Sequence, residues 1–203
     1  MKMKNVVFDF GQVLVRFDPA YIVAQYVRDP ADAALLEEVV FDRLYWDRMD
    51  AGTMTDDELM TLARGRLHER LWEIAGTIYY NWIYHLPEIE GMRELIVSLK
   101  EEYGVSVYLL SNISCLFAAH AKEIPILSLL DGCVFSAVCK MVKPNGEIFR
   151  HLCDTFAIEP SESVFVDDRQ DNIEGARGEG FVGYCFDGDA ARLRAYLDGI
   201  LKK

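Results

Sequence analysis

The chain has 203 residues, and its 33 acidic against 21 basic side chains give a formal net charge of −12 at pH 7. This balance excludes a protein that holds nucleic acid or an anionic membrane by bulk charge, because both are polyanions. The hydrophobic fraction of 51% excludes a disordered chain, and the length favours one domain, with room for an insertion. A small anionic ligand is not excluded, but local cations or a metal ion would have to bind it.

The first predicted element is a buried strand near the N-terminus. Residues 5–10 are apolar except for Asn5 and Asp9, and Gly11 follows, which is typical of a strand that runs into a loop. From residue 17 to residue 86 the apolar residues recur with helical spacing, and a capping box opens one of the helices. We expect about four helices in this segment.

Strands and helices alternate from residue 87 onward. The predicted strands are 105–110, 131–138, 163–166 and 181–186, and the predicted helices are 89–104, 146–156, 172–178 and 190–201. This alternation predicts a mostly parallel sheet with helices on both faces. We therefore expect an α/β fold with a three-layer, Rossmann-like core made of residues 1–16 and 87–203. The helical insertion 17–86 should lie near the carboxyl edge of the sheet, where such sheets bind ligands.

Three of the predicted strands end in polar residues. They are followed by Asp9, by Ser111 and by the pair Asp167-Asp168, and Lys143 lies in a loop between the last two. Because the carboxyl ends of parallel strands meet at one edge of a sheet, these side chains should lie close together. A single acidic residue in such a place is more often a loop cap than a functional group. The interpretation therefore depends on the whole set.

The chemical types of these side chains fit a metal ion and a phosphate group. Clustered carboxylates without His or Cys suit Mg²⁺, which prefers hard oxygen ligands. The Lys143 ammonium group can neutralise phosphate oxygens, and the Ser111 hydroxyl can hydrogen-bond to them. Asp9 could then attack phosphorus and form an aspartyl phosphate.

The motifs resemble, in order, motifs I to IV of the haloacid dehalogenase superfamily. They are Asp9-Phe10-Gly11, Leu110-Ser111-Asn112, Lys143-Pro144 with Glu147-Ile148-Phe149, and Val166-Asp167-Asp168 with Asp171-Asn172. The helical insertion is similar to that family's C1-type cap. The run FDFGQVLV and the segment from Trp46 to Gly52 resemble a subgroup of sugar-phosphate phosphatases that includes the bacterial α-D-glucose-1-phosphate phosphatase.

The resemblance implies a metal site at the ends of the first and fourth strands. Asp9 would be the nucleophile and also a ligand of Mg²⁺, and the backbone carbonyl of Gly11 would be a further ligand. Asp168 would be the main ligand of the last motif, with Asp167 a direct or indirect ligand.

The resemblance also implies a phosphate site beside the metal. Ser111 and Asn112 would hold the phosphoryl group, and Lys143 would balance its charge and that of the nucleophile. Asp171 and Asn172 would support the loop that carries the metal-binding aspartates.

One position departs from the pattern of the family's phosphatases. Most of these enzymes carry an aspartate two residues after the nucleophile, which protonates the leaving group and then activates water, but Gly11 stands there in this chain. The glucose-1-phosphate phosphatase subgroup resembles this chain at the same position and is active. General acid–base catalysis typically contributes about 10²- to 10⁴-fold in rate. Either another group or water replaces this aspartate, or the leaving group needs no proton, or the protein is catalytically weak.

The sequence thus favours Mg²⁺-dependent hydrolysis of a small phosphomonoester, with a sugar phosphate as the preferred substrate and Trp46 as the first candidate for a substrate contact. The alternative is a 2-haloacid dehalogenase, which also lacks the aspartate because halide needs no proton. The pair Asp167-Asp168 argues against it, because a dehalogenase needs no metal. A second alternative is a phospho-accepting receiver-type domain or a catalytically weak binding protein. The receiver interpretation is disfavoured, because a receiver domain carries its aspartate pair before the phosphorylated aspartate in the chain and has no helical insertion after its first strand.

Cysteine usage and the N-terminal residues predict a cytoplasmic location. Residues 1–8 contain too few apolar side chains for a signal peptide, and no run reaches the roughly 18 apolar residues of a membrane helix. The five cysteines are odd in number and lack CxxC spacing, which is typical of reduced core thiols. We expect a monomer or a small homo-oligomer that acts on a small phosphorylated metabolite, without nucleic-acid or membrane partners.

Overall fold

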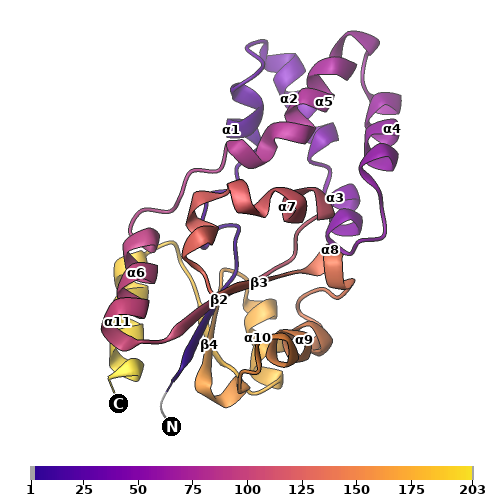
Figure 1. Ribbon diagram of the computed structural model, residues 1–203. Coiled ribbons are helices and arrows are strands. Elements are labelled where there is room, and N and C mark those ends of the chain that lie inside the picture. Colours follow the sequence, from indigo (N-terminus) through magenta and orange to yellow (C-terminus); the bar gives the residue numbers. More distant parts are fainter. Residues whose placement is uncertain (1–2, 203) are drawn as a thin grey trace.

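The computed structural model describes residues 3–202 and contains a five-stranded parallel sheet (Figure 1). The strands are β1 (Asn5–Phe8), β2 (Ser106–Ser111), β3 (Gly132–Phe135), β4 (Ser163–Asp167) and β5 (Val182–Cys185). Their order in the sheet is β3-β2-β1-β4-β5, and every neighbouring pair is parallel. The first strand of the chain is therefore the central strand of the sheet.

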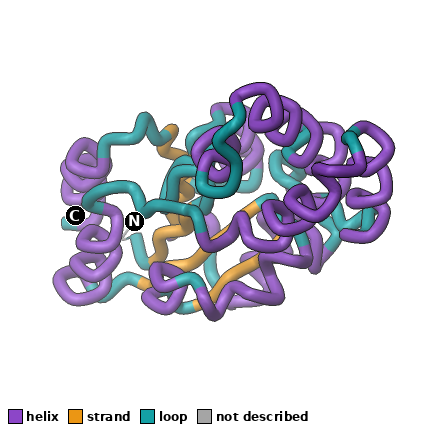
Figure 2. The backbone as a smooth tube through the Cα atoms, turned by 90° about the horizontal axis from the view of Figure 1, so that it is seen from above, coloured by secondary structure: helices purple, strands orange, loops and turns teal. Residues whose placement is uncertain are grey.

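Helices follow the strands and surround the sheet (Figure 2). The α-helices are α1 (Pro19–Ala24), α2 (Pro30–Val40), α3 (Arg43–Asp50), α4 (Asp56–Arg66), α5 (Trp72–Asn81), α6 (Met92–Tyr103), α7 (Cys115–His120), α8 (Ser136–Cys139), α9 (Gly146–Phe156), α10 (Gln170–Gly178) and α11 (Ala190–Leu201). Short 3-10 helices are η1 (Glu69–Leu71), η2 (Trp82–Tyr84), η3 (Ala121–Glu123), η4 (Pro125–Leu129) and η5 (Pro160–Glu162). Within residues 3–202, no helix is both long and apolar enough to cross a membrane.

The side chains of the central strands alternate between two hydrophobic clusters. Val6 and Phe8 of β1 lie in the cluster that contains the apolar faces of α6 and α11, whereas Val7 lies in the cluster that contains those of α9 and α10. This alternation follows from the two-residue period of a strand. The sheet is thus covered on both faces, which confirms the predicted three-layer α/β fold.

Helices α1 to α5 lie together beyond one end of the sheet, opposite the two termini (Figure 1). We call residues 17–86 the helical segment. Asp18, Asp29, Asp42 and Thr55 each accept a backbone hydrogen bond at the start of a helix, and Thr55 forms the expected capping box with Glu58. The segment contains five α-helices and two 3-10 helices, somewhat more than the four or so expected.

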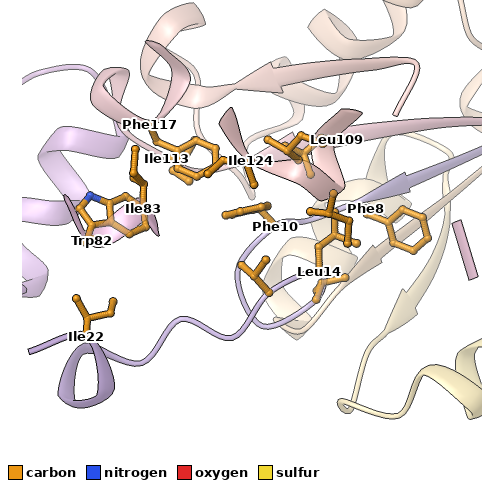
Figure 3. Close-up of a cluster of buried hydrophobic side chains, with 14 of the residues drawn as sticks. Phe8, Phe10, Leu14, Ile22, Trp82, Ile83, Leu109, Ile113, Phe117 and Ile124 are labelled. Carbon is orange, nitrogen blue, oxygen red and sulfur yellow. The ribbon is translucent and has the colours of Figure 1, made fainter. Parts of the chain in front are cut away.

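The hydrophobic core is continuous between the sheet and the helical segment (Figure 3). Phe8 and Leu109 lie on the sheet side of this cluster, and Trp82 lies on the side of the helical segment. Phe10 and Phe117 lie between them, with ring centroids 4.7 Å apart, and Trp82 stacks on Phe117 at 5.8 Å. These contacts hold the helical segment against the edge of the sheet where the strands end.

Several predicted boundaries were wrong by up to three residues, and the helix predicted to begin at residue 89 begins at Met92. The predicted strand 131–138 is β3 only as far as Phe135, and α8 begins at Ser136. A short apolar run does not distinguish a strand from a buried helical turn, and here the Ser136 hydroxyl accepts a hydrogen bond from the Ile113 amide, 2.8 Å away. The helix predicted to begin at Asn172 begins at Gln170 instead.

Candidate active site

The carboxyl ends of three adjacent strands form the floor of the site. Asp9 follows β1, and its amide donates to the Val166 carbonyl of β4 at 2.9 Å. Ser111 is the last residue of β2, and Asp167 is the last residue of β4. Because β2, β1 and β4 are neighbours in the sheet, residues about 100 and 56 positions apart in the chain meet at one edge.

Lys143 lies buried between two carboxylates. Its Nζ atom is 2.8 Å from Oδ1 of Asp9 and 2.6 Å from Oδ2 of Asp167, and only 4% of the residue is exposed. Burial alone would lower the pKa of Lys143, but the two facing carboxylates raise it above its usual value. The lysine therefore stays charged and compensates the negative charge of the site.

Asp167 is held firmly by its neighbours. It is fully buried, and its carboxylate accepts hydrogen bonds from Asn172 Nδ2 at 3.0 and 3.1 Å and from the Arg169 amide at 2.9 Å. Asp171 pairs with the Arg169 guanidinium at 2.6 Å and accepts from the Asn172 amide at 2.9 Å. Asp171 and Asn172 thus form hydrogen bonds and an ion pair within the loop after β4.

The Asn112 side chain binds the backbone of Lys143, and its predicted contact with the phosphoryl group stays a prediction. Its Nδ2 donates to the Lys143 carbonyl at 3.0 Å, and its Oδ1 accepts from the Lys143 amide at 2.8 Å. Both ends of the amide are therefore engaged with the backbone of the lysine loop. The Asn112 side chain ties this loop to the end of β2.

Three carboxylates could hold a metal ion. Oxygen atoms of Asp9, Asp167 and Asp168 lie within 4.8 Å of one another. Burial raises the pKa of Asp9 to about 6, although the charge of Lys143 opposes this rise, and burial also raises the pKa of Asp168. Oδ1 of Asp9 is buried and lies 2.8 Å from Lys143 Nζ. Three clustered carboxylates beside a single lysine leave an excess of negative charge, which fits a hard divalent cation.

A cavity of about 180 Å³ opens above this floor. The helical segment contributes Phe17, Arg43, Trp46, Asp50, Trp82 and Leu86, and the rest of the chain contributes Asp9, Phe10, Gly11, Gln12, Val15, Ser111, Asn112, Ile113, Lys143, Asp168, Arg169 and Asn172. The cavity thus has a polar floor, and one wall is formed by the helical segment. Of the predicted site residues, Asp167 and Asp171 do not line it.

Three of the six residues in the helical wall are aromatic, namely Phe17, Trp46 and Trp82. The Trp46 ring lies 5.3 Å from that of Phe17 and 5.0 Å from that of Trp82, measured between centroids. The indole N–H of Trp46 donates to the Val40 carbonyl at 2.8 Å. The only polar atom of the Trp46 ring is therefore already hydrogen-bonded within the protein. A contact between Trp46 and a substrate stays a prediction.

Asp50 also lines the cavity, although it is not among the predicted site residues. It is the last residue of α3, and its carboxylate has no hydrogen-bond or ion-pair partner within residues 3–202. Burial raises the pKa of Asp50 to about 7, Arg43 opposes the rise, and Asp47 and Asp9 add to it. One sequence signal pointed to this residue, because a carboxylate in the last turn of a helix opposes the helix dipole.

Comparisons with known proteins agree with this geometry. A sesquiterpene phosphatase of Aspergillus oryzae, astK, is 26% identical over 181 residues, covering 89% of this chain and 88% of that protein. A D-ribitol-5-phosphate phosphatase of Bacteroides thetaiotaomicron is 29% identical over 189 residues, covering 88% of this chain and 89% of that protein.

A solved structure shares the fold over nearly the whole chain. It is the HAD family enzyme bt-2542 of Bacteroides thetaiotaomicron, an Asp-to-Ala variant in complex with magnesium and inorganic phosphate. The TM-score is 0.70 at 21% identity, covering 94% of this chain and 98% of that one. The family model described as haloacid dehalogenase-like hydrolase matches residues 3–180. The chain therefore belongs to the haloacid dehalogenase-like hydrolase family.

Proposed function

We propose that this protein is a Mg²⁺-dependent phosphatase that hydrolyses a small phosphomonoester through a phosphorylated Asp9. The observation that carries the proposal is the buried contact of Lys143 with Asp9 and Asp167, at the floor of a cavity that Asp168 also lines. A nucleophilic carboxylate, a fixed cation and a further carboxylate pair are what phosphoryl transfer through an acyl phosphate needs. Both curated relatives described above are phosphatases by name.

The metal would be held at the ends of β1 and β4. Asp9 and Asp168 would supply carboxylate oxygens and Gly11 its backbone carbonyl, whereas Asp167 is already engaged by Lys143 and Asn172. When bound, Mg²⁺ would neutralise charge on the phosphoryl oxygens and help to orient the substrate.

Residues of the chain itself attack the phosphorus atom and bind the phosphoryl group. The Asp9 carboxylate attacks phosphorus, and Lys143 compensates the charge of the nucleophile and of the phosphoryl oxygens. The hydroxyl of Ser111, at the end of β2, hydrogen-bonds to the phosphoryl group. Water then cleaves the acyl phosphate and restores Asp9. Residues 1–16 and 87–203 act as the catalytic core, and residues 17–86 act as a cap that excludes bulk water and selects the substrate.

A small polar metabolite fits this site best. The cavity of about 180 Å³ is small, and its aromatic wall, with Trp46 at its centre, suits the apolar face of a sugar or sugar alcohol. The ribitol phosphate named for one relative supports this class, whereas the sesquiterpene named for the other favours a more apolar leaving group. We favour a sugar phosphate.

The test is Mg²⁺-dependent release of phosphate from p-nitrophenyl phosphate and from a panel of sugar phosphates. We expect EDTA to abolish release, and Asp9→Asn to do the same while the protein stays folded. Phosphate release by Asp9→Asn at the wild-type rate would contradict the nucleophile assignment. Release of chloride from 2-chloropropionate without added metal would favour the dehalogenase alternative.

A further inference from the structure

The site lacks a proton donor where the sequence comparison expects one. Gly11 stands two residues after Asp9, and a Cβ atom built on Gly11 would meet nothing within 4 Å. Steric crowding therefore does not require glycine at this position. Another group has to protonate an alkoxide leaving group if the substrate is an alkyl phosphate.

Asp50 has an unpaired carboxyl group within the described residues, and it lines the same cavity from the helical segment. It lines the cavity together with Asp9 and Lys143, and none of the described side chains forms a hydrogen bond or ion pair with its carboxylate. The charged groups that act on it are Arg43 and Asp47 of its own helix and Asp9 and Lys143 of the floor. Arg43 is engaged elsewhere, because its Nε atom lies 2.7 Å from Oδ1 of Asp47.

The backbone of Asp50 is locked to the edge of the sheet. The Ser136 hydroxyl donates to the Asp50 carbonyl at 2.6 Å and accepts from the Ile113 amide at 2.8 Å, so one side chain joins α3 to the loop after β2. Two residues later, Gly52 adopts a φ of +66°, and a Cβ there would lie 2.5 Å from the Ala137 carbonyl oxygen. This close approach fixes the end of α3 against α8.

We propose that Asp50 is the general acid and general base of this enzyme and replaces the carboxyl group that is missing at Gly11. This inference rests on the proposed phosphatase function. As the Asp9 oxygen bonds to phosphorus, the bond from phosphorus to the leaving oxygen breaks, and that oxygen takes the proton of Asp50. The Asp50 carboxylate then accepts a proton from the water that attacks the phosphorylated Asp9. The bond between phosphorus and the Asp9 oxygen breaks, which releases inorganic phosphate and restores both carboxyl groups.

Burial supports this assignment. A carboxyl group that works as an acid at neutral pH must keep its proton there, and the burial of Asp50 raises its pKa to about 7. The same group, once ionised, is basic enough to accept a proton from water in the second step.

The test compares leaving groups. It uses Asp50→Asn, with Asp154→Asn as the matched control, because Asp154 is an exposed carboxylate in the last turn of α9 and does not line the cavity. The substrates are p-nitrophenyl phosphate, whose phenolate leaves without a proton, and the primary-alkyl phosphate that the wild type hydrolyses fastest. We expect Asp50→Asn to lower kcat/KM for the alkyl phosphate by about 10²- to 10⁴-fold and for the aryl phosphate by less than about tenfold.

A second readout separates catalysis from positioning. With p-nitrophenyl phosphate, Asp50→Asn should release one nitrophenolate per enzyme in a burst and then turn over slowly, because the phosphorylated Asp9 lacks its base. The double variant Gly11→Asp with Asp50→Asn should regain at least about tenfold in kcat/KM on the alkyl phosphate, since the space beside Gly11 is open.

The outcomes distinguish this inference from the proposed function. Equal losses on both substrates without a burst would overturn the assignment of Asp50, and so would unchanged kinetics. If Asp9→Asn kept hydrolysing p-nitrophenyl phosphate, the proposed function itself would fail, whatever Asp50→Asn does.

Discussion

Replacing Asp50 by asparagine should stabilise the folded protein at neutral and alkaline pH. Burial raises the pKa of Asp50 from 3.8 to about 7. One pKa unit corresponds to about 1.4 kcal/mol, so an ionised Asp50 lowers the free energy of unfolding by at most about 4 kcal/mol. Because part of the side chain faces the cavity, solvent reduces this cost, and we expect about 2 kcal/mol.

The sign of the effect follows from proton binding. Between about pH 4 and pH 7 the folded chain keeps the Asp50 proton that the unfolded chain has lost, so this contribution to stability decreases as pH rises. Above about pH 7 the folded chain has also lost this proton, so Asp50 no longer adds to the free energy of unfolding. Asparagine has no proton to lose, so Asp50→Asn should match the wild type near pH 4 and exceed its unfolding free energy by about 2 kcal/mol near pH 8.

Urea unfolding followed by tryptophan fluorescence measures this difference. The experiment is done with EDTA at both pH values, so that no divalent cation binds the carboxylates. The control Asp154→Asn should stay within about 0.5 kcal/mol of the wild type at both, because Asp154 is exposed and lies outside the cavity. A wild type that is more stable than Asp50→Asn near pH 8, or a difference that does not change with pH, would refute the reasoning.

Two further substitutions test how the site is held. Lys143→Met leaves Asp9 and Asp167 buried without their cation, and we expect urea unfolding in EDTA to show a loss of about 3–5 kcal/mol. A loss below about 1 kcal/mol would mean that the two carboxylates are not compensated by this lysine. Gly52→Ala forces a side chain into a left-handed conformation and against a carbonyl of α8, so it should destabilise the protein by about 1–2 kcal/mol or more. It should also lower kcat on alkyl phosphates, and unchanged kinetics would show that the end of α3 need not be fixed.

The floor of the site was predictable because parallel strands bring their ends together. The positions of Asp9, Ser111 and Asp167 after apolar runs were enough to place them at one edge. A lysine in a loop is by itself no sign of a site. Lys143 could be assigned to the site only because it accompanies these strand-end residues. These residues are far apart in the chain, and only the order of the parallel strands shows that they are close in space.

Asp50 was not predictable in this way. It lies on a helix, where no rule of sheet topology says which residue faces a ligand. Its position depends on the hydrogen bond from Ser136, which joins residues 86 positions apart. Ser136 was predicted to lie inside a strand, so the segment that fixes Asp50 was assigned to the wrong kind of element.

The central place of β1 has a consequence for how the chain folds during synthesis. Asn5 pairs with Ser106 on one side and with Ser163 on the other, so β1 gains its second partner only after β4 has been made. At about 5–20 residues per second, a ribosome needs about 8–30 s to reach the second partner. The helical segment has mostly local contacts and can form early in this interval. Until β4 emerges, one edge of β1 stays open to other chains, so nascent or truncated chains that end before residue 163 are the ones most exposed to aggregation.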